Sequence, residues 1–297
     1  MGTYDLTMKR LTSKFSEDYV RFALKVEQFA VEHLDVKEAD KELPSLAREV
    51  DFVAKVKVGE EQAILLIEFQ TAWVAEMPER MAGYSWRLFE RYHLGVYPVV
   101  VVLRSGGRLQ NEWRMQVLGR EMAWWRFEVI PVWEAESQEV VAQKLAGIYP
   151  LLPLMQWEGK SAEEILEESQ RLILEEIEDR EERADAYVAL RVLSGIKYPL
   201  EFVHQILRRK EIMLESPVYQ EILEEGRVAG LKEGQEEGLR ESVLEVLEVR
   251  FGVVPLDVRE QVRQIRGKET LQGLLRRVAV VESIEAFRDE LSKIQIS

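Results

Sequence analysis

The hydrophobic residues between positions 50 and 103 change their spacing several times, and this change constrains the fold more than any other feature of the sequence. Residues 50–58 place their side chains alternately on two faces, as a strand does, and residues 63–70 are rich in Ile and Leu. Because Gly59 to Gln62 supplies a turn between them, we expect two strands joined as a hairpin. Residues 77–94 then return to helical spacing. The segment therefore predicts strands and helices that share one core.

Further elements extend this pattern on both sides. We expect a helix over residues 14–34, a buried strand over 97–103 and another strand over 127–133. The resulting order, α-β-β-α-β-β, predicts an α/β fold with a small mixed sheet flanked by helices. After about residue 135 the spacing is helical almost throughout, over residues 137–149, 161–181, 184–195, 199–215, 217–251, 257–265, 269–280 and 282–294.

The transition between these two regions contains Pro150 and Pro153. We therefore predict two domains, with the sheet in residues 1–135 and only helices in residues 136–297. The charges are divided in the same way. Of the formal net charge of −14, residues 1–133 contribute −2, from 18 basic and 20 acidic side chains, and the rest of the chain contributes −12. Only the second region is strongly acidic, so the first region could still bind a polyanion.

Composition excludes several classes of protein. With 46% hydrophobic and 32% charged residues the chain has enough apolar material for a core. The absence of cysteine excludes disulfide scaffolds, thiolate zinc sites and a cysteine nucleophile. Because no apolar run reaches the ~18 residues of a membrane span and no signal-peptide core is visible, we expect a cytoplasmic protein with no membrane partner.

Glycine recurs at every fourth position in residues 226–238, at Gly226, Gly230, Gly234 and Gly238. On a helix these residues form a smooth stripe, although each glycine costs ~1 kcal/mol relative to alanine. One interpretation is that a second helix packs closely against the stripe, which would give a homo-oligomer through the C-terminal helices. The other is a flexible connector.

Two acidic residues of the predicted hairpin point to chemistry. With a two-residue loop at Glu60-Glu61, Asp51 faces Gln70, and Glu68 shares their side of the sheet because side chains alternate. Carboxylate oxygens are ligands that Mg²⁺ prefers. The alternative interpretation is a half-exposed sheet whose polar residues face water.

The surrounding motifs resemble those of the PD-(D/E)XK nuclease superfamily, and within it the recombination-promoting, transposase-like branch. The motif REVD includes Arg48, Glu49 and Asp51, and the next strand ends in E-x-Q, at Glu68 and Gln70. A helix follows with an arginine and a tyrosine in the sequence ERMAGY, and then the aliphatic strand PVVVVL. The resemblance covers roughly residues 10–133, and the glycine-rich segment is similar to tails of that branch.

This resemblance implies a restriction-endonuclease-like core and a Mg²⁺- or Mn²⁺-dependent DNA endonuclease linked to recombination or transposition. Asp51 and Glu68 would be the metal ligands. Gln70 stands where the superfamily signature has lysine, so it would orient the attacking water by hydrogen bonds without adding charge. We also expect Glu68→Gln to abolish cleavage without unfolding the protein, because two neighbouring carboxylates repel each other when no metal is bound.

Basic residues next to this site could hold the substrate. Arg80, Tyr84 and Arg87 share one helix face, which could bind phosphates while the tyrosine stacks, or could simply be solvated. Trp124 and Trp125 beside Arg126 could contact nucleic acid, although packing is the expected role. A different class of function, a catalytically inactive DNA-binding or oligomerisation module, agrees better with the net charge and the missing lysine.

Overall fold

The computed structural model describes residues 3–33 and 50–292. The chain divides into two compact units, residues 1–220 and residues 221–297. This division differs from the predicted junction near residue 135. The reason is that the helices after the sheet pack against the N-terminal helices and against one another, so they belong to the first unit.

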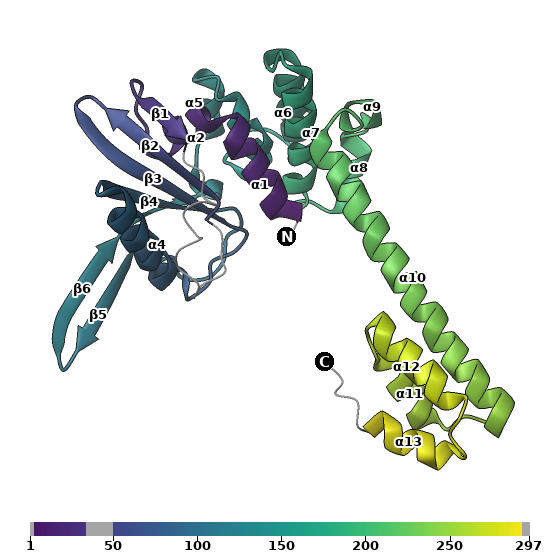
Figure 1. Cartoon of the computed structure of the whole chain (residues 1–297). Coiled ribbons are helices and arrows are strands. Elements are labelled where there is room, and N and C mark those ends of the chain that lie inside the picture. Colours follow the sequence, from purple (N-terminus) through teal and green to yellow (C-terminus); the bar gives the residue numbers. More distant parts are fainter. Residues whose placement is uncertain (1–2, 34–49, 293–297) are drawn as a thin grey trace. The chain divides into compact units, whose positions relative to one another are not determined.

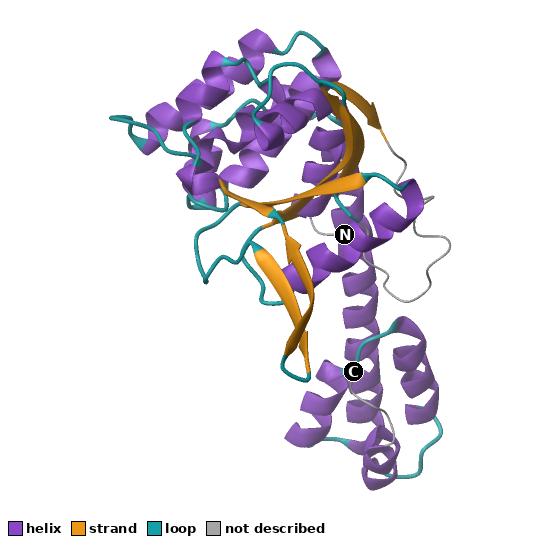
Figure 2. Ribbon diagram, turned by 90° about the vertical axis from the view of Figure 1, so that its left-hand side faces the viewer, coloured by secondary structure: helices purple, strands orange, loops and turns teal. Residues whose placement is uncertain are grey.

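A five-stranded mixed sheet forms the centre of the first unit (Figure 2). Its strands lie in the order β1-β2-β3-β4-β7, with antiparallel pairs from β1 to β3 and parallel pairs from β3 to β7. Their bounds are Ala30–His33, Phe52–Val58, Glu61–Gln70, Gly95–Val102 and Glu128–Pro131. The predicted small mixed sheet flanked by helices is therefore confirmed.

Helices cover both faces of this sheet (Figure 1). Helix α4, Met77–Tyr92, packs its buried Met81 and Leu88 on one face, in a core cluster with Leu66 of β3. On the opposite face, the ring of Tyr19 in α2 meets Phe69 edge-on, with the ring centroids 5.8 Å apart. Because both faces are covered, the central strands carry nearly continuous apolar runs.

The hairpin of β2 and β3 is paired two residues away from the predicted register. Phe52 pairs with Ile67 and Val53 with Leu66, and the turn lies at Gly59-Glu60. Gly59 has a φ of 60°, a conformation that glycine adopts easily, and this sets the turn one residue earlier than predicted. A shift of two residues leaves every side chain on its predicted face.

The predicted helix over residues 14–34 is wrong in its bounds. Helix α1 spans Thr3–Lys14, α2 spans Ser16–Leu24, and residues 30–33 form β1. Lys25 ends α2 in a left-handed conformation, with φ 54°. The apolar residues that follow have helical spacing, but they pair with the open edge of β2 instead.

A separate two-stranded arm, β5 (Glu112–Val117) and β6 (Arg120–Arg126), was not predicted. Trp125 packs edge-on against Trp86 of α4, with centroids 6.2 Å apart. Trp124 is 49% exposed and carries the guanidinium of Arg114 over its ring. Packing therefore accounts for Trp125, whereas Trp124 lies at the surface.

The remaining elements of the first unit are helical. The short helix η2, which is buried, packs against α6 and α7. The bounds are η1 Val132–Glu134, α5 Ser137–Ala142, η2 Ala146–Leu154, α6 Ala162–Glu176, α7 Arg180–Ser194, α8 Leu200–Ile206 and α9 Lys210–Met213.

The second unit contains most of α10 and has its own apolar core, which confirms the predicted helical C-terminal region. Its helices are α10 Pro217–Phe251, α11 Leu256–Gln264, α12 Lys268–Val278 and α13 Ile284–Ser292. The glycine stripe lies on α10, which is unbroken across it. A Cβ atom added at any of the four stripe glycines would meet nothing within 4 Å among the residues described. Over residues 3–33 and 50–292, no helix combines the length and the apolar character that crossing a membrane requires.

Candidate active site

The predicted acidic residues lie at one end of the β2–β3 hairpin. Asp51 immediately precedes β2, and its Oδ2 accepts a hydrogen bond of 2.8 Å from the backbone N–H of Phe69. Glu68 and Gln70 flank Phe69 in β3, and their side chains leave the strand on the face opposite to the Phe69 ring. The structure therefore brings Asp51 to the segment that carries both Glu68 and Gln70.

Glu68 lies on the face that α4 covers, and it is only 2% exposed. Its Oε1 accepts a hydrogen bond of 2.5 Å from Nη2 of Arg80, a residue of α4. The interpretation of a half-exposed sheet with polar residues in water is therefore wrong at this position. A buried carboxylate is costly unless a cation accompanies it, and Arg80 supplies that cation.

The charge of Arg80 is maintained by its surroundings. Burial by itself lowers the pKa of the guanidinium, but the interaction with Tyr84 and the negative charges of Glu68 and Asp51 raise the pKa above its ordinary value. The site therefore contains two carboxyl groups and one permanently charged guanidinium. This arrangement was not foreseen from the sequence, which placed Arg80 toward the substrate only.

Tyr84 is held between two arginines. The guanidinium carbons of Arg80 and Arg87 lie 5.8 and 5.1 Å from the centroid of its ring. The Arg87 Nε donates to the carbonyl of Gly83. Since Tyr84 is 6% exposed and belongs to the core under α4, its ring is not a surface on which a base can stack. Its position suits it to orient Arg80 instead.

The donor set fits a hard divalent cation. Carboxylate oxygens from Asp51 and Glu68 and the amide oxygen of Gln70 are ligand types that Mg²⁺ accepts together with water. Within the described ranges there is no group of three or more His, Cys, Asp or Glu residues that could hold a metal ion, so the chain offers a pair of carboxylates and not a full cage. Arg48 and Glu49, which form part of the motif seen in the sequence, lie outside the described residues.

The site opens at the carboxyl ends of the parallel strands β3 and β4. Just past these ends the backbone N–H of Leu103 donates to the carbonyl of Gln70 at 2.9 Å, and that of Arg104 donates to Thr71 at 3.0 Å. Ligands of α/β sheets commonly bind at such strand ends. A pocket of about 470 Å³ adjoins this edge, and it could not be predicted from the sequence because its walls come from distant segments.

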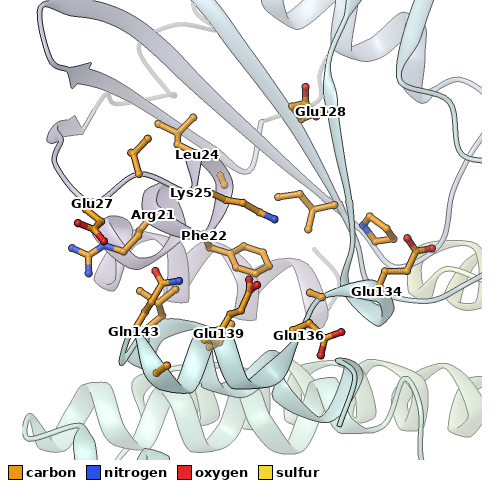
Figure 3. A pocket seen from close by; sticks show the side chains of 18 of the residues that line it. Arg21, Phe22, Leu24, Lys25, Glu27, Glu128, Glu134, Glu136, Glu139 and Gln143 are labelled. Carbon is orange, nitrogen blue, oxygen red and sulfur yellow. The ribbon is translucent and has the colours of Figure 1, made fainter. Parts of the chain in front are cut away.

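A larger pocket of about 910 Å³ lies elsewhere, bordered by the end of α2, β7, η1 and α5 (Figure 3). It includes Tyr97 and Glu128 near the amino ends of β4 and β7, whereas the candidate site lies at the carboxyl ends. Its lining has five glutamates, Glu27, Glu128, Glu134, Glu136 and Glu139, against two cations, Arg21 and Lys25. This excess of negative charge disfavours nucleic acid.

No protein-family model, no curated protein and no solved structure matches the chain. Any function assigned to the chain therefore rests on the geometry of the site described above.

Proposed function

We propose that the protein is a Mg²⁺-dependent hydrolase of phosphodiester bonds in DNA, with its active site at Asp51, Glu68 and Gln70. The observation that carries the proposal is the bond from Phe69 N–H to the Asp51 carboxylate. It holds one acidic side chain against the strand that presents a second, buried acid and an amide. Mg²⁺ is commonly bound by one or two carboxylates together with water and phosphate oxygens.

Asp51 and Glu68 would hold the metal ion. When bound, Mg²⁺ lowers the pKa of coordinated water and stabilises negative charge on a phosphoryl group. Gln70 cannot ionise, so its part is to orient water through its amide oxygen and NH₂ group. Arg80 has a side chain that is 20% exposed, and its planar guanidinium can bind a phosphate through two parallel hydrogen bonds. Tyr84 keeps that guanidinium in place.

One observation favours a second candidate function. Arg80 already neutralises Glu68 in the protein alone, as a purely structural ion pair does. A nuclease-like fold that has no lysine beside its acidic pair can also serve as a DNA-binding module without hydrolysis. The two functions differ in one property, because only the hydrolase needs a divalent metal ion to act on DNA.

Nicking of supercoiled plasmid separates them. The wild-type protein is incubated with Mg²⁺, with Mn²⁺ and with EDTA, and is compared with Asp51→Asn and Glu68→Gln. Glu61→Gln is the matched control, because Glu61 begins the same strand but is exposed. We expect metal-dependent nicking by the wild type and the control, and a loss of at least about 100-fold in both site variants. Equal nicking by Asp51→Asn would refute the site, and metal-independent binding without nicking would support the inactive module.

A further inference from the structure

The pocket at the carboxyl end of β4, which we call the indole pocket, is lined by two tryptophans, two cations and small polar and apolar groups. Its residues are Leu103, Arg104, Ser105, Trp133, Leu154, Met155, Gln156, Trp157, Ile165, Ile196 and Lys197. We propose that it binds one unpaired nucleotide of the DNA strand next to the cleaved bond, with the base against an indole and the phosphate on Arg104 and Lys197. This inference rests on the proposed function.

The first argument is charge. Among the described residues that line the indole pocket, none is acidic, although the chain as a whole carries −14. The larger pocket shown in Figure 3 has the opposite balance, with five glutamates. Within the part of the chain that the structure describes, neither Arg104 nor Lys197 forms an ion pair. A pocket with two uncompensated cations in an acidic protein favours an anionic ligand.

Lys197 strengthens this argument. Its Nζ donates to the carbonyl of Pro153 at 2.9 Å, which holds the ammonium group in place. Burial lowers the pKa of Lys197, and no carboxylate acts to restore it. A bound phosphate would stabilise the charged form of this lysine. The protein therefore gains more from an anion here than at a fully hydrated surface lysine.

The second argument is the aromatic lining. Trp157 is fixed by a hydrogen bond of 2.8 Å from its indole N–H to the carbonyl of Leu152, and the ammonium group of Lys160 lies 4.6 Å from its ring centroid. Trp133 is half-buried and no described cation lies over its ring, so we assign the stacking role to Trp133. Stacking on an aromatic ring is how proteins bind unpaired bases. At about 470 Å³ the pocket lies within the size range of small-ligand sites.

The third argument is position. The backbone bonds from Leu103 to Gln70 and from Arg104 to Thr71 join one wall of the indole pocket directly to the strand end that carries the candidate active site. One wall of the indole pocket and the candidate active site therefore belong to neighbouring strand ends of the same sheet. Since the base must leave its pairing partner to enter a concave site, we expect preference for single-stranded DNA over a duplex.

The test measures binding separately from cleavage. The full-length protein in EDTA is titrated into a fluorescein-labelled 12-nucleotide oligo(dT) and, separately, into a matched blunt duplex. Unlabelled dTMP is then added as a competitor of the labelled oligo(dT). The variants are Arg104→Gln, Lys197→Gln and the double variant, and Lys144→Gln is the control because Lys144 is an exposed lysine of the same unit that lies outside the pocket. Trp133→Phe tests the ring, and the two cation variants cover the case in which the tryptophan variant fails to fold.

We expect oligo(dT) to bind more tightly than the duplex, the double variant to lose about tenfold or more in affinity, and the control to change less than about twofold. Unchanged affinity in the double variant would overturn the pocket, and so would stronger binding of the duplex. If oligo(dT) does not bind, the assignment to a DNA strand is overturned, and if dTMP does not displace oligo(dT), the assignment to a single nucleotide is overturned. Wild-type nicking that persists beside a failed pocket result would leave the proposed function standing, whereas pocket binding without metal-dependent nicking would overturn the hydrolase alone.

Discussion

Glu68 and Arg80 form the pair on which the candidate site depends. The Glu68 side chain is almost fully buried under α4, and the Arg80 side chain beside it has only a fifth of its surface exposed. Removing one partner of such a pair leaves the other charge without compensation in a poorly hydrated place. Arg80 thus changes what a substitution at Glu68 does, compared with a pair of carboxylates that only repel each other.

We therefore predict that Glu68→Gln lowers the free energy of unfolding by about 1–3 kcal/mol in the absence of metal. This reverses the expectation drawn from the sequence. Urea denaturation of the wild type, Glu68→Gln, Arg80→Met and the double variant measures the coupling between the two side chains, and Glu61→Gln serves as the exposed control. If Glu68→Gln is as stable as the wild type, repulsion between Asp51 and Glu68 outweighs the ion pair.

Asp18 offers a pH-dependent prediction at the same scale. Burial raises the pKa of Asp18 above its ordinary value near 3.8, more than the hydrogen bond from Gly147 N–H and the charge of Arg21 lower it. The folded protein thus binds this proton more tightly than the unfolded chain does. The contribution of Asp18 to stability therefore falls as the pH rises from the unfolded pKa through the folded pKa.

Asp18→Asn keeps the oxygen that accepts the 2.7 Å bond from Gly147 N–H and removes the buried charge. We expect the variant to be more stable than the wild type by up to about 1 kcal/mol at pH 7, and the difference to shrink as the pH falls toward 4. Thermal unfolding followed by circular dichroism across this range checks it. A difference that grows toward acid pH would show that the Asp18 carboxylate is stabilised in the folded protein.

At the scale of elements, the local spacing of apolar residues and the contacts with neighbouring strands together decide whether a segment becomes a helix or a strand. The strands around Asp51 and Glu68 follow the sequence because both faces of the sheet are apolar and Gly59 permits a tight turn, although the turn lies one residue earlier than predicted. Residues 30–33 show the opposite case, because their apolar spacing suits a helix, yet an open strand edge offers backbone hydrogen bonds that a helix end does not. The arm of β5 and β6 carries mostly exposed side chains, so its sequence lacks the alternation of apolar and polar residues that predicts a strand packed on a core.

The glycine stripe of α10 yields a prediction at this scale. Since no described atom lies within 4 Å of a Cβ added at Gly230 or Gly234, alanine fits at both. We expect the double variant Gly230→Ala/Gly234→Ala to raise the stability of the helix by about 1–2 kcal/mol in total and to leave the molecular mass in solution unchanged. Thermal unfolding at 222 nm and light scattering measure the two quantities. A smaller mass in the variant would favour the close packing of a second helix on the stripe.

At the scale of the whole molecule, charge limits how DNA can bind. A chain with a net charge of −14 repels a polyanion over most of its surface, so the contacts must be few and local. Among the described residues, the cations that we assign to phosphate contacts near the candidate site and the indole pocket are Arg80, Arg87, Arg104 and Lys197. This assignment allows four phosphate contacts.

We predict that the logarithm of the DNA affinity falls with the logarithm of salt concentration with a slope no steeper than about −4, because each phosphate contact contributes ~0.9 or less. Fluorescence anisotropy between 50 and 200 mM salt checks this, and Arg104→Gln/Lys197→Gln should make the slope shallower by about 1–2. A slope steeper than about −6 would require a second basic surface and would contradict this assignment.

The sequence by itself determined the α/β class, the central hairpin, the aliphatic strand β4, the helical second part of the chain and the side of the sheet that Glu68 and Gln70 share. These features depend on residues close together in the chain, whose spacing and turn chemistry act locally. The tertiary structure decided the burial of Glu68, its pairing with Arg80 and the burial of Tyr84. It also decided that residues 136–220 belong with the sheet, and it built the indole pocket from five separate segments. These features depend on which surfaces of distant segments exclude water together, and the spacing of residues along one segment does not contain that information.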